Sequence, residues 1–186
     1  MSRLFPSVVE AVVFWGILTL YFVAVLTWVV RNRKARGNRR RDLVPLILLA
    51  IIAVIVIGYA RIGTLPHWLF YPGEALFVAG AAFTAWSYSL LGRNLSPYAE
   101  VMPDHEVIEA GPYKYLRHPG YLGQIIAFVG LGLALQSWVA LLTILVIAMG
   151  LLAYRMRIEE DLMVKGLGAR YTNYAARTRR IIPFIW

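Results

Sequence analysis

Long apolar stretches separated by short polar segments dominate the sequence. A helix needs roughly 20 apolar residues to cross ~30 Å of hydrocarbon at ~1.5 Å per residue. Five stretches come close to this requirement and predict five membrane-spanning helices: residues 8–30, 43–60, 75–91, 121–135 and 138–154. Only Gln136 and Ser137 separate the last two stretches, which predicts a tight helical hairpin. The pattern therefore predicts an all-α integral membrane protein.

Composition supports this prediction and removes several classes of chemistry. The chain has 186 residues, of which 60% are hydrophobic, and its mean hydropathy is +0.63. These values exclude an ordinary soluble domain. Because the chain contains no cysteine, disulfides, thiolate nucleophiles and cysteine metal sites are excluded as well.

The distribution of charge predicts how the chain crosses the membrane. The net charge is +9, and 17 of the 19 Lys and Arg residues fall on one side of the predicted spans, with only Arg3 and Arg61 on the other. Cytoplasmic loops carry such an excess of Lys and Arg. We therefore predict an outside N-terminus and a cytoplasmic C-terminus. The basic loop 31–41 is expected to contact anionic lipid headgroups rather than nucleic acid.

The two halves of the chain differ in polarity. No repeat or low-complexity segment is present, so residues 1–186 are predicted to form a single membrane domain. Residues 1–92 read as a helical scaffold, in which the small residues at 79–82 allow another helix of the chain to approach closely. Seven of the ten acidic residues lie at 100–161. Residues 93–186 are therefore expected to carry the functional chemistry.

Two polar segments precede the fourth predicted span. In residues 91–98, Gly92 and Pro97 are expected to end the third span. In residues 105–121, two pairs of turn-forming residues, at 111–112 and 119–120, are expected to bring four side chains together on a compact loop: His105, Tyr113, His118 and Tyr121. Pro119 suits the first turn of the fourth helix, whose N-terminal N–H groups would favour a carboxylate or a sugar hydroxyl nearby.

A third polar segment continues the fifth predicted helix. Arg155 and Glu159 are four residues apart and share a helical face. The Arg155 guanidinium can bind a carboxylate through two hydrogen bonds, and Glu159 can accept hydrogen bonds from ribose hydroxyls or an ammonium. Glu160 is expected to face elsewhere and to brace the tail. His67 falls on the opposite side of the membrane from the other two His, so no three-histidine metal site is expected, and no phosphate-binding glycine loop is present.

These segments resemble the isoprenylcysteine carboxyl methyltransferase family and its relatives among membrane phospholipid methyltransferases. The resemblance depends on GPYxYxRHPxYxG at 111–123, on RxxxEE at 155–160 and on a closing stretch at 168–183. It covers about residues 91–186. The closing match is inexact, because Ile181 and Ile182 precede its proline.

The resemblance implies an integral membrane enzyme that uses S-adenosylmethionine, with S-adenosylhomocysteine as product, and no metal. Its cofactor site would be cytoplasmic, formed by the loop 93–120 and the C-terminal helix and tail, so that residues 93–186 form the catalytic core. Arg155 would bind the substrate carboxylate and act in catalysis, with Asn94 a second catalytic candidate. The residues that would contact the cofactor are Tyr98, His105, Glu106, Val107, Ile108, Tyr113, His118, Pro119, Gly120, Tyr121 and Glu159.

The implied reaction is carboxyl O-methylation of a lipophilic, isoprenylcysteine-like substrate. The expected partners are a lipid-like or prenylated substrate and membrane lipids, without nucleic acid. Three alternatives remain open at this point: N-methylation of a phospholipid or another amine by the same fold, a membrane sterol-type reductase that uses NADPH, and a scaffold without enzymatic activity. Gly120 replaces a serine that is frequent in the eukaryotic enzymes, which argues against a hydroxyl role at this position.

Overall fold

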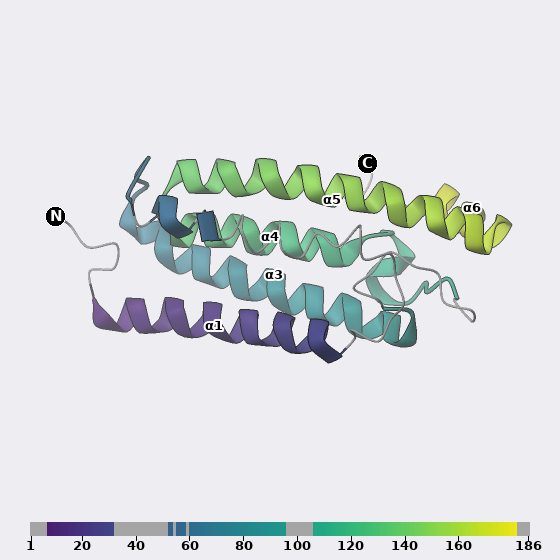
Figure 1. Ribbon diagram of the computed structural model, residues 1–186, viewed down its shortest axis with the longest axis horizontal. Coiled ribbons are helices and arrows are strands. Elements are labelled where there is room, and N and C mark those ends of the chain that lie inside the picture. Colours follow the sequence, from purple (N-terminus) through teal and green to yellow (C-terminus); the bar gives the residue numbers. More distant parts are fainter. Residues whose placement is uncertain (1–6, 32–51, 54, 59, 96–105, 182–186) are drawn as a thin grey trace.

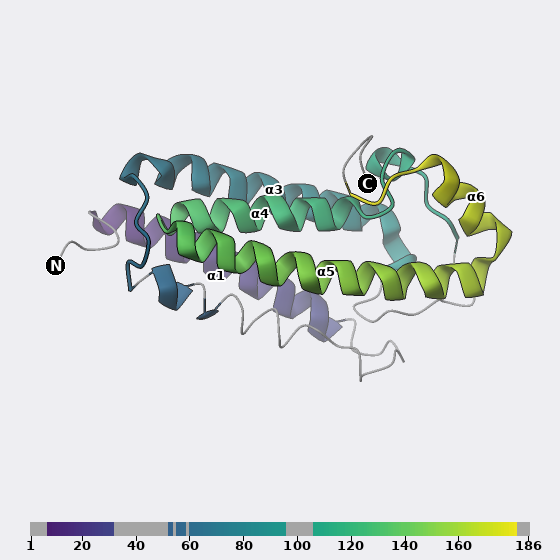
Figure 2. The same cartoon turned by 90° about the horizontal axis from the view of Figure 1, so that it is seen from above.

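The computed structural model describes residues 7–31, 52–53, 55–58, 60–95 and 106–181, and within these residues the chain is helical and contains no strand. The long helices run side by side along the molecule, and α6 folds back at the far end of α5 (Figures 1 and 2). The helices are α1 (Val8–Arg31), α3 (Phe70–Leu91), α4 (Pro119–Ala134), α5 (Trp138–Leu167) and α6 (Ala169–Arg177), with short 3-10 helices η2 (His67–Leu69), η3 (Gly92–Asn94) and η4 (Gly111–Lys114).

The observed helices agree with four of the predicted spans. Three helical segments are long and apolar enough to cross a membrane: α1, η2 together with α3, and α5. Helix α4 is apolar but has only 16 residues. The predicted span 43–60 lies largely outside the described residues, although residues 52–53 and 55–58 are helical. The total of five spans therefore stays a prediction.

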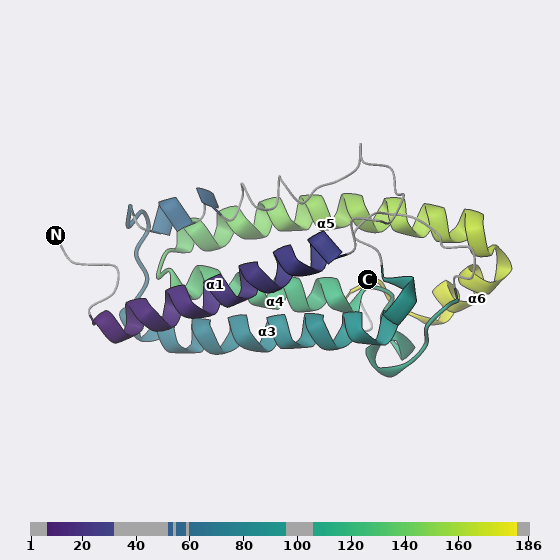
Figure 3. The ribbon, with the colours of Figure 1, turned by 60° about the horizontal axis from the view of Figure 1, so that its bottom comes forward.

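Helices α3 and α4 pack with their backbones in close contact along most of their length (Figure 3). A Cβ atom added at Gly80 would collide with the backbone of Ala127, and one added at Gly123 would collide with Thr84. In a membrane, helices associate through such close packing, because lipid already solvates apolar side chains. The close helix approach predicted for residues 79–82 is confirmed, and the partner is α4 of the same chain.

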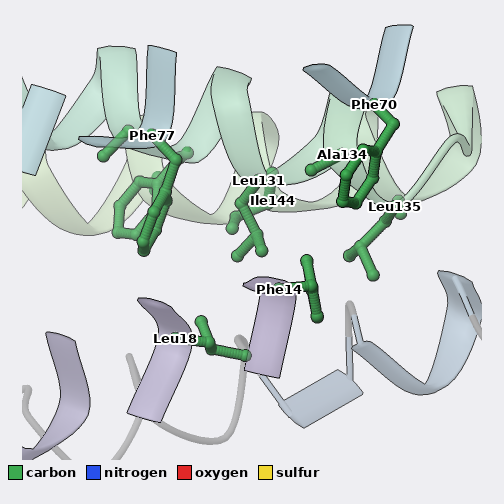
Figure 4. Close-up of a cluster of buried hydrophobic side chains, with 12 residues drawn as sticks. Phe14, Leu18, Phe70, Phe77, Leu131, Ala134, Leu135 and Ile144 are labelled. Carbon is green, nitrogen blue, oxygen red and sulfur yellow. The ribbon is translucent and has the colours of Figure 1, made fainter. Parts of the chain in front are cut away.

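A closed apolar core fills the half of the bundle that lies near the α4–α5 turn. Its members are at most 5% exposed, and Figure 4 shows eight of them projecting from four helices into one cluster: Phe14, Leu18, Phe70, Phe77, Leu131, Ala134, Leu135 and Ile144. The turn itself is fixed by Ser137, whose Oγ accepts a hydrogen bond from the backbone N–H of Ala140 (3.0 Å) and caps α5.

A polar cluster ties the same end of the bundle together. The Glu10 carboxylate accepts a hydrogen bond from the Tyr71 hydroxyl (2.9 Å) and lies 3.1 Å from Nε2 of His67. The Nδ1 atom of His67 lies 3.2 Å from Oε1 of Gln136. We call Glu10, His67, Tyr71 and Gln136 the Glu10 cluster. It joins α1, η2, α3 and the α4–α5 turn, and it places His67 at the opposite end of α4 from His118, as predicted.

Candidate active site

The segment before α4 and the segment after α6 lie side by side in extended contact. The backbone N–H of Arg179 donates to the carbonyl of Tyr115 (2.9 Å), and the N–H of Arg117 donates to the carbonyl of Arg179 (2.7 Å). The N–H of His118 donates to the carbonyl of Arg180 (3.0 Å). These bonds hold the tail against the N-terminus of α4, so that residues about 60 positions apart in the sequence become neighbours.

Helix α6 covers this junction with two buried tyrosines. The Tyr174 hydroxyl donates to the carbonyls of Tyr113 (2.8 Å) and Leu116 (3.2 Å). Burial raises the pKa of Tyr113, of Tyr171 and of Tyr174 above the ordinary value for tyrosine. All three side chains therefore stay neutral near pH 7 and act as hydrogen-bond donors or as aromatic surface.

Glu160 is the centre of a charged cluster at this junction. Its carboxylate accepts hydrogen bonds from Nε of Arg117 (2.8 Å) and from Nε and Nη2 of Arg180 (3.0 and 2.8 Å). It also lies 3.3 Å from Nε2 of His118. We call Glu160, Arg117, His118 and Arg180 the Glu160 cluster. Since it connects α5 to both the α4 N-terminus and the tail, Glu160 braces the tail as predicted.

Tyr121, Arg155 and Glu159 form a second polar group on the other side of His118. The Tyr121 hydroxyl donates to Oε1 of Glu159 (2.6 Å), and Nε of Arg155 lies 2.8 Å from both the Tyr121 oxygen and Oε1 of Glu159. The His118 ring stacks on the Tyr121 ring with centroids 5.4 Å apart. We call these three residues the Tyr121 triad. The sequence placed the loop before α4 and the end of α5 in one site, and the structure brings them into direct contact.

The triad borders a cavity of about 1090 Å³ that runs from the α6 end into the bundle. Ten of the candidate residues line it: Asn94, Glu106, Val107, Ile108, Tyr113, His118, Gly120, Tyr121, Arg155 and Glu159. Pro119 is buried at the start of α4 and is not among the lining residues. Tyr98 and His105 lie outside the described residues.

Asn94 connects two parts of the cavity wall. Its Nδ2 donates to the backbone carbonyl of Glu106 (3.1 Å). This bond ties the 3-10 helix after α3 to the 106–108 segment, all three residues of which line the cavity. Asn94 thus shapes the polar end of the cavity besides lining it.

Sequence reasoning missed a hydrogen-bonded pair of polar residues inside the predicted spans. Tyr88 of α3 and Gln124 of α4 both line the cavity, and Nε2 of Gln124 donates to the Tyr88 hydroxyl (2.7 Å). The Tyr88 ring covers Gly120, where an added Cβ would collide with it. Hydrogen-bonding side chains within otherwise apolar spans were the available signal, because such groups need a partner away from water.

The cavity changes character along its length. Its polar end is formed by the triad, His118, Asn94 and residues 106–108, whereas its inner part is an apolar arm between α1 and α3. Residues of 1–92 therefore share the cavity with residues of 93–186. The triad supplies one anion, Glu159, and one cation, Arg155, and the arm supplies an apolar surface. This combination suits two ligands bound together: a charged polar molecule and an amphiphile with a long apolar tail.

Comparisons with known proteins agree with this geometry. Residues 68–170, more than half of the chain, match the family model of phospholipid methyltransferases. Protein-S-isoprenylcysteine O-methyltransferase B of Arabidopsis thaliana is 24% identical over 120 residues, which cover 63% of this chain and 61% of that protein. Protein-S-isoprenylcysteine O-methyltransferase of Saccharomyces cerevisiae is 30% identical over 82 residues, covering 44% of this chain and 34% of that protein.

The fold has a counterpart among solved structures. The structure of a eukaryotic intramembrane Ras methyltransferase, isoprenylcysteine carboxyl methyltransferase, superimposes with a TM-score of 0.73 at 20% identity, covering 95% of this chain and 68% of that one. The chain spans about three fifths of the Arabidopsis relative and about one third of the yeast one. The chain belongs to the phospholipid methyltransferase family, and it has the fold of isoprenylcysteine carboxyl methyltransferase.

Proposed function

We propose that the protein is an S-adenosylmethionine-dependent methyltransferase that acts in the membrane on the carboxyl group of a lipophilic, isoprenylcysteine-like acid. One observation carries the proposal: the charged Tyr121 triad lines the same cavity as an apolar arm. The curated relatives named above, isoprenylcysteine O-methyltransferases, support the same reaction class.

The polar end fits a sulfonium nucleoside that carries an amino acid group. Glu159 supplies a carboxylate for ammonium or ribose hydroxyl groups, and the rings of His118, Tyr113 and Tyr171 supply aromatic surface for a base or a cation. Backbone groups of residues 106–108 complete this end. When bound, S-adenosylmethionine supplies an electrophilic methyl group on a positively charged sulfur.

Arg155 is the proposed anchor for the acceptor acid. A carboxylate is already ionised near neutral pH, so no general base is required. The guanidinium of Arg155, oriented by Glu159 and Tyr121 through its Nε, would hold the carboxylate by charge-assisted hydrogen bonds. Its task is to fix the orientation of the acceptor, because correct alignment of the two reactants contributes much of the rate in a direct displacement. Asn94 is the second candidate on the acceptor side.

The remaining elements would enclose the reactants and exclude water. Helix α6 and the tail cover the polar end through Tyr174 and the Glu160 cluster. The apolar arm would hold the lipid tail of the acceptor. The proposal includes five spans with an outside N-terminus, the site and the C-terminus on the cytoplasmic side, and a catalytic core at 93–186 supported by 1–92.

N-methylation of a phospholipid amine is the second candidate, and the description of the matching family favours it. It requires a neutral amine as nucleophile. A buried guanidinium beside the acceptor would repel the ammonium form of that substrate, so Arg155 favours the carboxylate. The products of the two reactions differ in stability toward base: a methyl ester releases methanol, whereas an N-methyl group is not released.

Purified protein in detergent micelles tests the proposal. Incubation with methyl-labelled S-adenosylmethionine and N-acetyl-S-farnesylcysteine is expected to yield a product that releases labelled methanol in base. A parallel incubation uses phosphatidylethanolamine as the acceptor, and label on its amine that base does not release as methanol would instead support N-methylation. Absence of transfer to either acceptor would overturn the assignment to a methyltransferase of this kind.

A further inference from the structure

The apolar arm of the cavity ends at two aromatic rings. Tyr21 of α1 and Phe77 of α3 both line the arm, and their rings meet edge to face with centroids 5.2 Å apart. Beyond them lies the closed core, in which Phe14 and Leu18 are 2% and 4% exposed (Figure 4). Ile17, one turn before Tyr21 on α1, and Phe128 of the core also line the cavity. The two rings, backed by these residues, therefore form a floor at the end of the arm.

The space above this floor has a definite length. Between Phe77 and Tyr88 the α3 wall of the cavity includes three alanines, Ala81, Ala82 and Ala85, which leave room for a chain. Tyr88 marks the polar end on α3, because its ring lies against Gly120, the neighbour of Tyr121. It is eleven residues from Phe77, which corresponds to ~16 Å along a helix. An extended chain advances ~1.2 Å per bond, as in a peptide backbone, so the arm matches about thirteen bonds.

We propose that Tyr21 and Phe77 determine the length of the acceptor tail. The inference rests on the proposed function and adds a specificity to it: acids whose tails have about thirteen main-chain atoms fit best, which favours a chain of three isoprene units over one of four. A longer tail must displace the two rings or fold back on itself. Because the rings are packed against the core, displacing them is unfavourable.

A series of acceptors measures this specificity. N-acetyl-S-alkylcysteines with linear chains of eight to twenty carbons are compared as substrates in mixed micelles at a constant surface mole fraction. In the wild type, kcat/KM is expected to be highest for chains of about thirteen carbons. For a chain a few carbons longer, kcat/KM is expected to be lower by a factor on the order of ten. Phe77→Ala and Tyr21→Ala are each expected to move the peak to longer chains.

Phe83→Ala is the matched control, because Phe83 lies on the same helix but does not line the cavity. It is expected to leave the peak in place. Since Phe77 also belongs to the core, Tyr21→Ala is the variant that carries the test if Phe77→Ala does not fold. A flat length profile in the wild type, or the same peak in the wild type and in Tyr21→Ala, overturns the proposal.

Binding of the same acids separates this inference from the proposed function. Isothermal titration of the series into wild type and Tyr21→Ala protein reports the fit of the tail without any methyl transfer. A length optimum in binding that shifts in the variant, without turnover of any acid, supports the aromatic floor and overturns the proposed function. Turnover without a length optimum in binding supports the proposed function and overturns the floor.

Discussion

The two ends of the bundle carry polar clusters of similar construction and different surroundings. Each cluster centres on a partly or fully buried glutamate that binds a histidine and ties several segments together: Glu10 with His67 at one end, and Glu160 with His118 at the other. At the Glu10 end the neighbouring space is filled by the apolar core. At the Glu160 end the cluster adjoins a second polar group, the Tyr121 triad, and a large cavity.

This difference shows that a buried ion pair does not by itself indicate a site. None of Glu10, His67, Tyr71 and Gln136 lines the cavity, so the Glu10 cluster is explained by its role in joining α1 to the rest of the bundle. The Glu160 cluster has the same joining role for the tail. The Glu160 end differs in having the Tyr121 triad, whose charged side chains line the cavity. Buried polar groups in a membrane are retained for structure or for function, and the adjacent cavity decides between them.

The largest expected effect comes from removing the acceptor anchor. Arg155→Ala is expected to lower methyl transfer about 10³-fold, the scale seen when a charged or dipolar transition-state contact is lost. Affinity for S-adenosylhomocysteine should change only a few-fold. Rate assays and isothermal titration on the same preparations measure both quantities. Arg157→Ala, an exposed arginine half a turn further along α5, serves as the control. A donor affinity reduced as strongly as the rate would contradict the division of roles.

Removal of donor contacts is expected to have the next largest effect. Glu159→Ala and His118→Ala should each weaken S-adenosylhomocysteine binding roughly 10- to 100-fold, as expected for the loss of a hydrogen bond to a charged group. His67→Ala makes the equivalent change at the Glu10 end and should leave this affinity unchanged. Titration calorimetry of the three variants gives a direct comparison of the two ends. Equal losses at both ends would mean that the effect is general destabilisation.

Neutralising the two central glutamates tests whether the clusters share a structural role. Glu160→Gln removes the anion that Arg117 and Arg180 share and is expected to cost about 3 kcal/mol of stability, at the low end for breaking a buried pair. Glu10→Gln should also lower the thermal midpoint, because a neutral amide binds His67 and Tyr71 more weakly than the carboxylate does. Only Glu160→Gln should reduce donor affinity as well, because the tail covers the polar end. Unchanged donor affinity in Glu160→Gln would separate the tail from the site.

The smallest expected effect concerns the contact between Gly120 and Tyr88. Gly120→Ala places a methyl group against the Tyr88 ring, and crowding of this kind typically costs about 1–3 kcal/mol. Methyl transfer is expected to fall about tenfold as Tyr88 moves into the cavity. Gly150→Ala on α5, where an added Cβ meets nothing within 4 Å, is the control. Wild-type rates in Gly120→Ala would show that methyl transfer does not depend on the position of the Tyr88 ring.

Much of the candidate site at the Glu160 end could be predicted from the sequence. The spacing of Arg155 and Glu159 placed both on one face of α5. The turn residues around Tyr113 and His118 placed these two side chains on one compact loop before α4. Both predictions depend on local geometry, which sequence determines well. The bracing role of Glu160 also followed from its position one residue beyond Glu159, on a different face of the helix.

The beginning of α3 and the apolar arm could not be predicted in the same way. The third span was expected to start at residue 75, after an aromatic stretch at 68–71 that was interpreted as interfacial. Helix α3 instead begins at Phe70, since a proline in the first turn loses no helical hydrogen bond and Gly73 meets the backbone of Ala134 on α4. The lining residues of α1 and α3 are apolar, and apolar residues that face a cavity are indistinguishable in sequence from those that face lipid.

The central claim is that the protein transfers the methyl group of S-adenosylmethionine to a lipid-linked carboxylate held at the Tyr121 triad. The most direct measurement is the base lability of the label transferred from S-adenosylmethionine to N-acetyl-S-farnesylcysteine by the wild type and by Arg155→Ala. The account predicts labelled methanol released by base from the wild-type product and almost none from the variant. A base-stable product, or a base-labile product formed equally well by both proteins, would contradict it.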